Sequence, residues 1–270
     1  MKPIITLLIF LLSLNKSSIK AQIKLSADGK SDTYTLINKT LINTSRKAVE
    51  VPDCNHQEFG KHITQVFDNT LKKYVFQFDI HVDGDFDRCK RFDRQRNEIK
   101  TNKNSNPILL ASENEIINYK WKFKIQKGFK ATKKNTSFHQ ITYRTKGTNE
   151  PLFALSARNK NGKQTLEVHY IKDDEKEVLV KIDLSKITGK WIVADETIHY
   201  HKNGSYWLSL KTIDGKEILN LNRNNLNTWF NTKVYARPKW GIYRSLEYKE
   251  QLRDETLWFA DIEVNDIKSN

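Results

Sequence analysis

The chain has 270 residues and a formal net charge of +14, because 46 lysines and arginines outnumber 32 aspartates and glutamates. No stretch beyond the N-terminus approaches the ~20 consecutive apolar residues of a transmembrane helix, which excludes an ordinary membrane-spanning protein. The two cysteines, Cys54 and Cys89, are too few for a disulfide-framework protein, although an oxidising compartment would permit a bond between them.

The N-terminus has the order of a secretory signal peptide. Lys2 is followed by an apolar run from Ile4 to Leu14 and a polar stretch that ends at Ala21. A charged residue, a short apolar run and a small residue in this order are typical of an export signal. We therefore expect residues 1–21 to be a signal peptide and residues 22–270 to form one domain of a secreted or periplasmic protein. A buried N-terminal strand is the alternative.

The charge that remains after export indicates a polyanionic partner. Removal of Lys2, Lys16 and Lys20 lowers the formal charge from +14 to +11 (14 − 3). Nucleic acid, anionic lipid and acidic polysaccharide are the candidate polyanions. Export favours the polysaccharide, so we expect neither a nucleic acid nor a membrane as partner.

From about residue 74 the sequence alternates apolar and polar positions, a period of two that predicts β-strands. The strand candidates are residues 74–82, 95–101, 118–125, 138–144, 151–158, 164–171, 177–184, 189–201, 205–212, 239–244 and 256–264. Asn-Gly and Asp-Gly pairs in NKNGK, HKNG and IDGK supply the residues that tight hairpins need. Short turns between so many strands predict an all-β sandwich or jelly roll.

Three parts of the chain lack this alternation. Residues 57–71 and 221–230 are expected to be helical or irregular. Residues 22–56 are rich in Ser, Thr, Asn and Lys and hold too little apolar material for a core of their own, so a separate N-terminal domain is not expected.

The segment DRQRNEIK, residues 93–100, is the most informative strand. Arg94, Arg96, Glu98 and Lys100 share one face, because side chains alternate with a period of two. Three cations in a row are unfavourable unless that face is wet or binds anions. Glu98 could hold Arg96 and Lys100 in fixed rotamers, ready for a carboxylate or a sulfate. A solvated outer strand is the alternative.

A second basic strand is predicted at residues 118–125, NYKWKFKI. Lys120, Lys122 and Lys124 face one way, and the aromatic and aliphatic residues face the other. The lysine face is either a solubilising edge or, beside another basic strand, the floor of an anion-binding groove.

Two later segments carry candidate proton-transfer groups. His139 and Gln140 are adjacent in SFHQI; a histidine titrates near neutral pH, as proton abstraction requires, although a lone histidine is more often structural. In RPKWGIYR, Lys239 and Tyr243 share a face of a regular strand, and Arg244 follows directly. A tyrosine beside a cation could donate a proton to a leaving oxygen. A core tyrosine with a satisfied hydroxyl is the alternative.

The turn Asp83-Gly84-Asp85-Phe86-Asp87 has alternating carboxylates that could bind a structural calcium ion. It lacks the later glutamate of a helical calcium loop, and a polar turn explains it equally well. The sequence has no HExxH, CxxC, GxxxxGK or GxSxG motif. We therefore expect no zinc site, phosphate loop or nucleophile elbow, and no required cofactor.

Four blocks, DRQRNEIKT, SFHQI, RPKWGIYRS and the closing LWFADIEV, together resemble the heparin lyase I-like group of polysaccharide lyases. The resemblance runs from about residue 74 to the C-terminus. It implies a concanavalin-like β-jelly roll, a two-sheet sandwich with a concave substrate groove, that acts on an acidic, uronate-containing polysaccharide. We expect the protein to be a monomer.

The resemblance also implies roles in β-elimination, in which a base removes the C5 proton of a uronate and an acid protonates the O4 leaving group. His139 is the expected base and Tyr243 the expected acid. The remaining roles are Arg96 and Gln140 at the uronate carboxylate, Glu98 as the group that orients Arg96 and Lys100, and Arg94, Lys239 and Arg244 at flanking acidic or sulfate groups. His139 and Gln140 point to opposite faces of a regular strand, so both reach the groove only if the strand is bulged.

A mature charge of +11 favours a densely anionic polymer, with ulvan as the first candidate substrate and heparin or heparan sulfate as the second. A non-catalytic binding module for acidic glycans is the main alternative function. A glycoside hydrolase of the same fold ranks lower, because it needs two carboxylates in the cleft and Glu98 has no evident partner. A nucleic-acid binder is disfavoured by export and by the lack of a known motif.

Overall fold

The computed structural model describes residues 19–42, 44, 46–144, 149–172, 175–230 and 234–267. It contains one α-helix, α1 (Thr33–Leu41), and three short 3₁₀ helices, η1 (Pro107–Leu109), η2 (Leu184–Lys186) and η3 (Lys249–Gln251). No helix in these ranges is long and apolar enough to cross a membrane. Nearly all other regular structure is β-strand.

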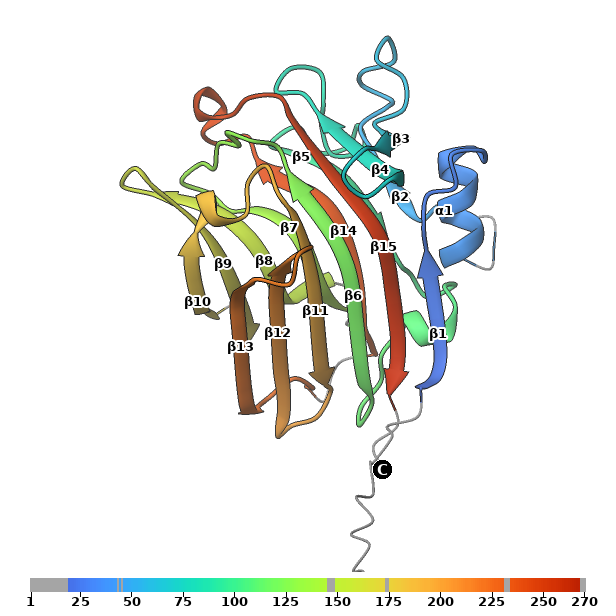
Figure 1. The fold of residues 1–270 in the computed structure, drawn as a ribbon, viewed down its shortest axis with the longest axis vertical. Coiled ribbons are helices and arrows are strands. Elements are labelled where there is room, and N and C mark those ends of the chain that lie inside the picture. Colours follow the sequence, from blue (N-terminus) through green and yellow to red (C-terminus); the bar gives the residue numbers. More distant parts are fainter. Residues whose placement is uncertain are drawn as a thin grey trace, which may run out of the picture.

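The strands form two antiparallel sheets that pack face to face (Figure 1). One sheet contains β1 (Ile19–Leu25), β3 (Ile63–Asp68), β4 (Lys73–Ile80), β6 (Ile116–Ile125), β11 (Trp191–His199), β12 (Gly204–Thr212), β13 (Glu217–Leu226) and β15 (Glu255–Ile267). Its order is β13-β12-β11-β6-β15-β4-β3, with β1 paired to β15. The other sheet contains β2 (Val49–Glu50), β5 (Arg94–Lys100), β7 (Thr136–Arg144), β8 (Asn149–Lys160), β9 (Lys163–Lys172), β10 (Glu175–Asp183) and β14 (Tyr235–Ser245), in the order β10-β9-β8-β7-β14-β5-β2. The predicted all-β jelly roll is confirmed.

The hydrophobic core lies between the two sheets. Trp121 and Phe123 of β6 point inward and are almost fully buried, as are Trp240 of β14, Phe78 of β4 and Phe259 of β15. This burial follows from the period-two pattern, which gives each strand one apolar face. Such a core holds the seven-stranded sheet rigid, and that sheet can therefore present polar side chains on its other face.

The lysines of β6 lie on the outer face of the eight-stranded sheet, away from β5. Lys122 donates to Asp261 at 2.5 Å, Lys120 lies 3.2 Å from Asp195, and Lys124 contacts Asp68 at 3.5 Å. These ion pairs belong to a solvated surface. The alternative of a shared anion-binding floor is wrong, because β5 and β6 belong to different sheets.

The eleven predicted strands are all present, but two segments predicted to be helical or irregular also form strands. β3 lies within residues 57–71 and pairs with β4, and most of β13 lies within residues 221–230 and pairs with β12. β13 is an edge strand in which only Leu219 and Leu221 are buried. A strand with so few buried side chains carries little hydrophobic pattern in its sequence.

The N-terminal segment joins the same core. Asp32 caps α1 by accepting from the backbone N–H of Thr35 at 3.0 Å, and Ile37 and Leu41 of the helix are buried against the sandwich. The predicted signal peptide lies outside the described residues up to position 18. β1 begins at Ile19 and pairs with β15, and the cleavage point after residue 21 stays a prediction.

A disulfide joins Cys54 and Cys89, whose Cα atoms lie 6.2 Å apart and which are 35 positions apart in sequence. It ties the loop after β2 to the turn before β5. In the chain-entropy picture, closing a loop of this length stabilises the fold by about 4 kcal/mol. The bond, left open by the sequence, fixes the segment that leads into the strand with the most densely charged face.

Candidate active site

One face of the seven-stranded sheet collects the polar side chains; we call it the cleft face. Directly paired residues of antiparallel strands project to the same side of a sheet. The pairing aligns two rows of residues across the strands: Arg96, Tyr243, Ser137, Ser156, Glu167 and Lys181 in the first, and Lys100, Lys239, Gln140, Ala154 and His169 in the second. Both rows run perpendicular to the strands, which is a course that an extended polymer can follow.

A cavity of about 440 Å³ opens on this face. Its lining comes from β5, β14, β7 and β8 and from the segments before β5: Glu50, Arg88, Arg96, Lys100, Gln140, Thr142, Pro151, Arg237, Lys239 and Tyr243. The sequence predicted five of these ten residues as site residues: Arg96, Lys100, Gln140, Lys239 and Tyr243. They come together because β14 lies between β5 and β7 in the sheet.

Glu50 is the centre of an ion-pair network in the cavity. Its carboxylate accepts from Lys100 Nζ at 2.5 Å, from Arg88 Nη1 at 2.5 Å and from Lys239 Nζ at 2.9 Å. Burial alone would raise the pKa of Glu50, but the surrounding cations outweigh burial and hold the pKa well below its usual range. Glu50 therefore stays ionised and keeps the cations in place.

Arg96 is held from two further sides. Its Nε donates to Asp87 at 3.0 Å, and its Nη1 donates to Glu98. Burial disfavours its charge, but the neighbouring carboxylates raise its pKa above the ordinary arginine value. The predicted clamp by Glu98 exists with one different partner: Glu98 accepts from Lys239 at 2.9 Å, while Lys100 binds Glu50.

The charged side chains around the cavity have a positive net charge. Five cations face the cavity or its rim: Arg88, Arg96, Lys100, Arg237 and Lys239. Three carboxylates, Glu50, Asp87 and Glu98, bind four of these cations, and Arg237 donates to the Thr101 carbonyl. The difference is +2 (five minus three). Because these cations are already fixed in orientation, the binding of an anion costs little side-chain conformational entropy.

Tyr243 faces the same cavity. Its hydroxyl accepts a hydrogen bond from Arg94 Nη1 at 2.7 Å, and the guanidinium carbon of Arg96 lies 4.2 Å from its ring centroid. Gly241, two residues earlier, has φ of 141°, and a Cβ there would collide with the backbone of Asn97 and Glu98. Only glycine lets β14 approach β5 this closely, which aligns Tyr243 with Arg96.

The structure places His139 away from the cleft, so its predicted role as base does not fit its position. The imidazole is buried between the sheets, where Nε2 lies 2.9 Å from Glu196 Oε2 and the ring packs 4.3 Å from Trp121. A bulge lies between Ser137 and His139, yet it turns His139 inward and leaves Gln140 in the cleft. Gln140 is the member of this pair that can contact a substrate.

Arg244 is the second predicted site residue that lies elsewhere. It points to the opposite face from Tyr243 and is 1% exposed. Its Nε donates to Gln95 at 2.6 Å and its Nη1 to the carbonyl of Arg253 at 2.9 Å. Burial lowers its pKa to about 10. Arg244 supports the fold beneath the cleft and does not contact the cavity.

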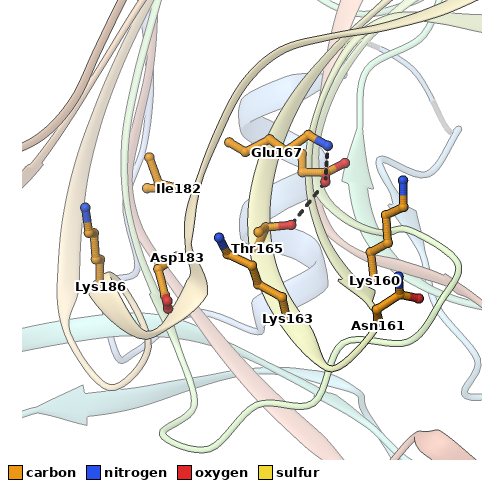
Figure 2. Close-up of a pocket in the computed structure, with 9 residues that line it drawn as sticks. Lys160, Asn161, Lys163, Thr165, Glu167, Ile182, Asp183 and Lys186 are labelled. Carbon is orange, nitrogen blue, oxygen red and sulfur yellow. Dashed lines mark hydrogen bonds and ion pairs between the residues drawn. The ribbon is translucent and has the colours of Figure 1, made fainter.

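A second hollow, of about 550 Å³, opens at the β9–β10 end of the sheet (Figure 2). Its walls carry four lysines, Lys160, Lys163, Lys181 and Lys186, together with Thr165, Glu167 and Asp183. Glu167 accepts from Thr165 at 3.1 Å and lies 3.6 Å from Lys181. It shares a row with Tyr243 three strands away, or about 14 Å at the usual strand spacing.

The carboxylates of the predicted calcium turn do not converge on one point. Asp83 is exposed and contacts Lys249 at 2.5 Å, and Asp87 binds Arg96. Asp85 is fully buried and turns toward histidine side chains. Three alternate residues of this irregular turn thus point in three directions, which favours the alternative of a polar turn over a calcium site.

Five residues of the cavity lining escaped prediction. Arg88 and Glu50 come from loops and a short strand with no pattern, and Thr142 and Pro151 carry no distinctive chemistry. Arg237 stands in the quoted segment RPKWG, two positions before Lys239 on the same face of β14, and this spacing was the available signal. His169 also lies in a cleft-face row but is fully buried.

The polysaccharide lyase family model matches residues 21–263 of the chain. No curated protein matches it. Among solved structures, it is similar to an endo-β-1,4-glucuronan lyase from the fungus Trichoderma reesei, with 12% identity, coverage of 92% of this chain and 95% of that chain, and a TM-score of 0.58. It is also similar to a marine alginate lyase from Aplysia kurodai, with 12% identity, coverage of 92% of this chain and 99% of that chain, and a TM-score of 0.58. For an alginate lyase from Pseudomonas aeruginosa the identity is 13%, the coverage is 81% of this chain and 96% of that chain, and the TM-score is 0.54.

At these identities the solved structures establish the common jelly-roll fold. They do not single out the heparin lyase I-like subgroup that the four sequence blocks resemble. The family model, by contrast, spans most of the sequence and agrees with the predicted class of enzyme. The chain therefore belongs to the polysaccharide lyase family.

Proposed function

We propose that this lyase cleaves an acidic, uronate-containing polysaccharide by β-elimination at Tyr243. The observation that carries the proposal is the hydroxyl of Tyr243 in a cavity lined by cations, which carboxylates such as Glu50 hold in position. The family supports a lyase, and the names of the similar structures, a glucuronan lyase and alginate lyases, support a uronate polymer.

The uronate carboxylate has a natural place beside Arg96, Lys239 and Gln140. Lys239 and Gln140 are directly paired across β14 and β7, and Arg96 lies on the next strand. Cations and an amide donor at the C6 carboxylate stabilise the charge that develops when the C5 proton leaves. Groups that are already oriented supply this stabilisation without reorganisation, which is often the largest contribution to catalysis.

Tyr243 takes both proton transfers in this proposal. Arg94 Nη1 donates to its oxygen at 2.7 Å and Arg96 lies 4.2 Å from its ring centroid, so two cations stand next to the charge that the reacting phenolate carries. The phenolate oxygen removes the C5 proton, the C5–H electron pair becomes the C4=C5 double bond, the C4–O4 bond breaks, and the same proton passes to O4. One group can serve both atoms when the C5 hydrogen and O4 lie on one face of the sugar, as in D-glucuronate and D-mannuronate.

The row from Arg96 to Lys181 offers a course for the polymer across the strands and ends in the second hollow, which Lys181 lines together with three further lysines. These lysines favour sulfate or carboxylate groups on flanking sugars. Ulvan therefore remains our first candidate and heparin or heparan sulfate the second. We also propose export of the enzyme, which the Cys54–Cys89 disulfide supports because such bonds persist in oxidising compartments.

The structure supplies the second carboxylate that a glycoside hydrolase would need, because Glu50 lies beside Glu98. Lys239 Nζ donates to both carboxylates at 2.9 Å. Hydrolysis, however, requires one carboxyl group to be protonated near neutral pH. The cations around Glu50 hold its pKa well below its usual range. Glu50 therefore does not suit the role of general acid, and Glu98 is bound by Arg96 and Lys239, which fits a structural and electrostatic role.

The test is incubation of the purified protein with ulvan, heparin, heparan sulfate, glucuronan and alginate, followed by ultraviolet absorbance of the unsaturated uronate. We expect absorbance to rise on at least one polymer that contains D-glucuronate or D-mannuronate, with products whose combined mass equals that of the substrate. Products heavier by one water, without a double bond, would establish hydrolysis instead. Binding without any product on all five polymers would contradict the proposal.

A further inference from the structure

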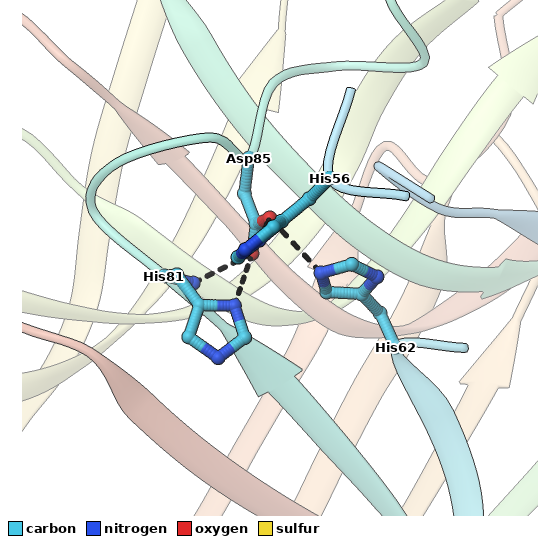
Figure 3. A group of neighbouring side chains, drawn as sticks. All are labelled: His56, His62, His81 and Asp85. Atoms are coloured by element: carbon cyan, nitrogen blue, oxygen red, sulfur yellow. Dashed lines mark hydrogen bonds and ion pairs between the residues drawn. The ribbon is translucent and has the colours of Figure 1, made fainter. Parts of the chain in front are cut away.

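Three histidines and one aspartate meet beside the cleft, at a place that the proposed reaction does not use (Figure 3). His56, His62, His81 and Asp85 each offer one ligand atom, and these four atoms all lie within 4.8 Å of one another. His62 and Asp85 are fully buried, and the side chains of His56 and His81 are 18% and 21% exposed. Four ligand-type groups thus converge in a largely dry site.

The fold brings these residues together from two segments, the one between β2 and β3 and the one between β4 and β5. His62 directly precedes β3 and His81 directly follows β4, so the antiparallel pairing of these strands sets the two rings 5.5 Å apart. His56 comes from the loop after β2, and Asp85 from the turn before β5. The irregular spacing explains why no zinc motif is visible in the sequence.

The histidine nitrogens all face one carboxylate. Asp85 Oδ1 lies 2.9 Å from His56 Nδ1 and 2.9 Å from His62 Nε2, and Asp85 Oδ2 lies 3.0 Å from His81 Nδ1. A tetrahedral zinc site with bonds of about 2.0–2.1 Å has its ligand atoms about 3.3 Å apart. Around such an ion the distances to Asp85 would lengthen by a few tenths of an ångström, and any wider separation within the 4.8 Å limit of the cluster would shorten to about 3.3 Å.

Outer contacts orient the rings in the way that metal-binding histidines require. His62 Nδ1 lies 2.9 Å from Asp53 Oδ1, and Asp53 also accepts from the Tyr34 hydroxyl at 2.7 Å. When His62 Nδ1 donates to Asp53, the Nε2 lone pair of the neutral ring points at the Asp85 carboxylate. Two acceptors at 2.9 Å repel each other unless a cation or a proton lies between them.

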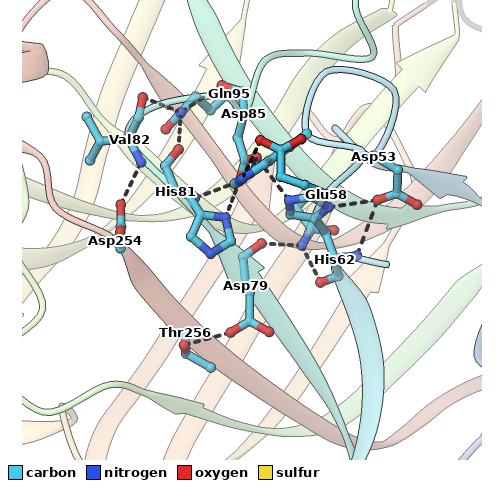
Figure 4. A network of polar contacts seen from close by, with 12 residues as sticks. Asp53, Glu58, His62, Asp79, His81, Val82, Asp85, Gln95, Asp254 and Thr256 are labelled. Carbon is cyan, nitrogen blue, oxygen red and sulfur yellow. Dashed lines mark hydrogen bonds and ion pairs between the residues drawn. The ribbon is translucent and has the colours of Figure 1, made fainter. Parts of the chain in front are cut away.

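The aspartate is fixed as firmly as the histidines (Figure 4). Asp85 Oδ2 accepts from the His81 backbone N–H at 2.6 Å. The amide nitrogen of Gln95 in β5 donates to the carbonyls of His81 at 2.5 Å and Asp85 at 2.7 Å. The outer nitrogen of His56 lies 3.6 Å from Glu58. Each prospective ligand therefore has a neighbour that restricts its position.

We propose that His56, His62, His81 and Asp85 form a binding site for a divalent transition metal, with zinc as the best fit. Three imidazole nitrogens and one carboxylate oxygen match zinc in ligand type and number, whereas calcium prefers six to eight oxygen ligands. Four protein ligands leave no open position for a substrate, so the site is structural.

The site connects to the cleft through the chain. Asp85 lies two residues before Asp87, and Asp87 binds Arg96. Gln95 holds the turn through the carbonyl of Asp85 and directly precedes Arg96 in the chain. The Cys54–Cys89 disulfide joins the same two segments. A bound metal would add a second cross-link there and keep the Asp87–Arg96 contact in place.

The test uses the full chain without a histidine tag. After exposure to zinc and removal of loose metal by gel filtration, we expect elemental analysis to give one zinc per chain. We expect cobalt(II) loading to give the intense visible absorption of a tetrahedral site, and the melting temperature to rise with zinc concentration and fall with a chelator. His81→Gln should lose all three signals, whereas the control His199→Gln should keep them.

His56→Gln, at a partly exposed ring, provides a second variant if His81→Gln does not fold. If the folded wild-type chain retains no zinc after gel filtration, the proposal is overturned. The three histidines would then be joined to Asp85 by hydrogen bonds alone. The same zinc content in wild type, His56→Gln and His81→Gln would also overturn the proposal. None of these readouts depends on lyase activity, so failure of the metal site and failure of the proposed reaction are distinguishable.

Discussion

Tyr243 and Arg96 are directly paired across strands β14 and β5, and the guanidinium carbon of Arg96 lies 4.2 Å from the centroid of the Tyr243 ring. Asp87 and Glu98 fix the guanidinium from its other sides. The tyrosine therefore rests on a cation whose own position is set by buried carboxylates. This arrangement links the charge network of the cleft to the group that we assign to proton transfer.

Arg96→Lys tests this link while it keeps the positive charge. Lysine has no planar group to lie on the Tyr243 ring and cannot bind Asp87 and Glu98 simultaneously in the same fork-like geometry. We expect kcat to fall by roughly tenfold or more with a smaller change in KM. Arg223→Lys, on the edge strand β13, is the control and should match wild type. An unchanged kcat in Arg96→Lys would remove Arg96 from the orientation of Tyr243.

His139→Gln separates a structural role from a catalytic one. The buried pair with Glu196 is weakened, so we expect stability to fall by about 1–3 kcal/mol. Turnover per folded molecule should stay within a few-fold of wild type, because His139 does not face the cleft. Urea unfolding and steady-state kinetics on the same preparation provide both values. A stable, folded His139→Gln with ~10²-fold lower turnover would restore the role of base.

Lys239→Ala removes a cation that binds both Glu50 and Glu98. The net charge around the cavity falls from +2 to +1, so we expect KM to rise by roughly tenfold or more, and the KM of the variant to depend less on salt than that of wild type. Lys211→Ala, an exposed lysine on β12 of the other sheet, is the matched control. Equal salt dependence in Lys239→Ala and wild type would count against substrate contact at this position.

Asp261 gives a pH-dependent contribution to stability. Burial alone would raise its pKa, but hydrogen bonds from Lys122 and Lys73, each at 2.5 Å, lower the pKa to about 2 from the ordinary aspartate value of 3.8. Because the pKa of Asp261 is lower in the folded state than in the unfolded state, its ionised carboxylate stabilises the fold at pH values above the unfolded-state pKa. This stabilisation is lost as the pH falls from 3.8 to about 2.

Asp261→Asn should therefore be less stable than wild type by roughly 1 kcal/mol at pH 7, after screening by solvent. The difference should shrink as the pH falls through this window. Denaturant unfolding at several pH values measures it. Asp83→Asn, which loses only an exposed contact with Lys249, should differ from wild type by less than about 0.5 kcal/mol. A constant difference for Asp261→Asn at all pH values would contradict the pKa assignment.

The sequence was informative where one strand carries one pattern. The alternation in DRQRNEIK and RPKWGIYR correctly predicted that Arg94, Arg96, Glu98 and Lys100 share a face, and that Lys239 shares one with Tyr243. The same alternation assigns Arg244 to the opposite face from Tyr243, so its exclusion from the cleft could have been anticipated.

Contacts between distant segments could not be predicted in this way. Glu50 precedes Arg96 by 46 positions and meets it only because β2 pairs with β5. The direction of His139 depends on a bulge that no local pattern records. The histidine cluster likewise arises from the β3–β4 pairing and two irregular loops. In each case the tertiary arrangement, and not local propensity, decides which side chains meet.

Tyr243→Phe provides the most direct test of the reaction that we assign to this cleft. The measurement is the initial rate of unsaturated uronate formation, followed by ultraviolet absorbance on a D-glucuronate polymer that the wild-type enzyme cleaves. Tyr74→Phe, an exposed tyrosine on β4, serves as control. We predict a loss of ~10²-fold or more for Tyr243→Phe with an unchanged melting temperature, and wild-type rates for the control. A folded Tyr243→Phe enzyme that forms the product at the wild-type rate would contradict the account.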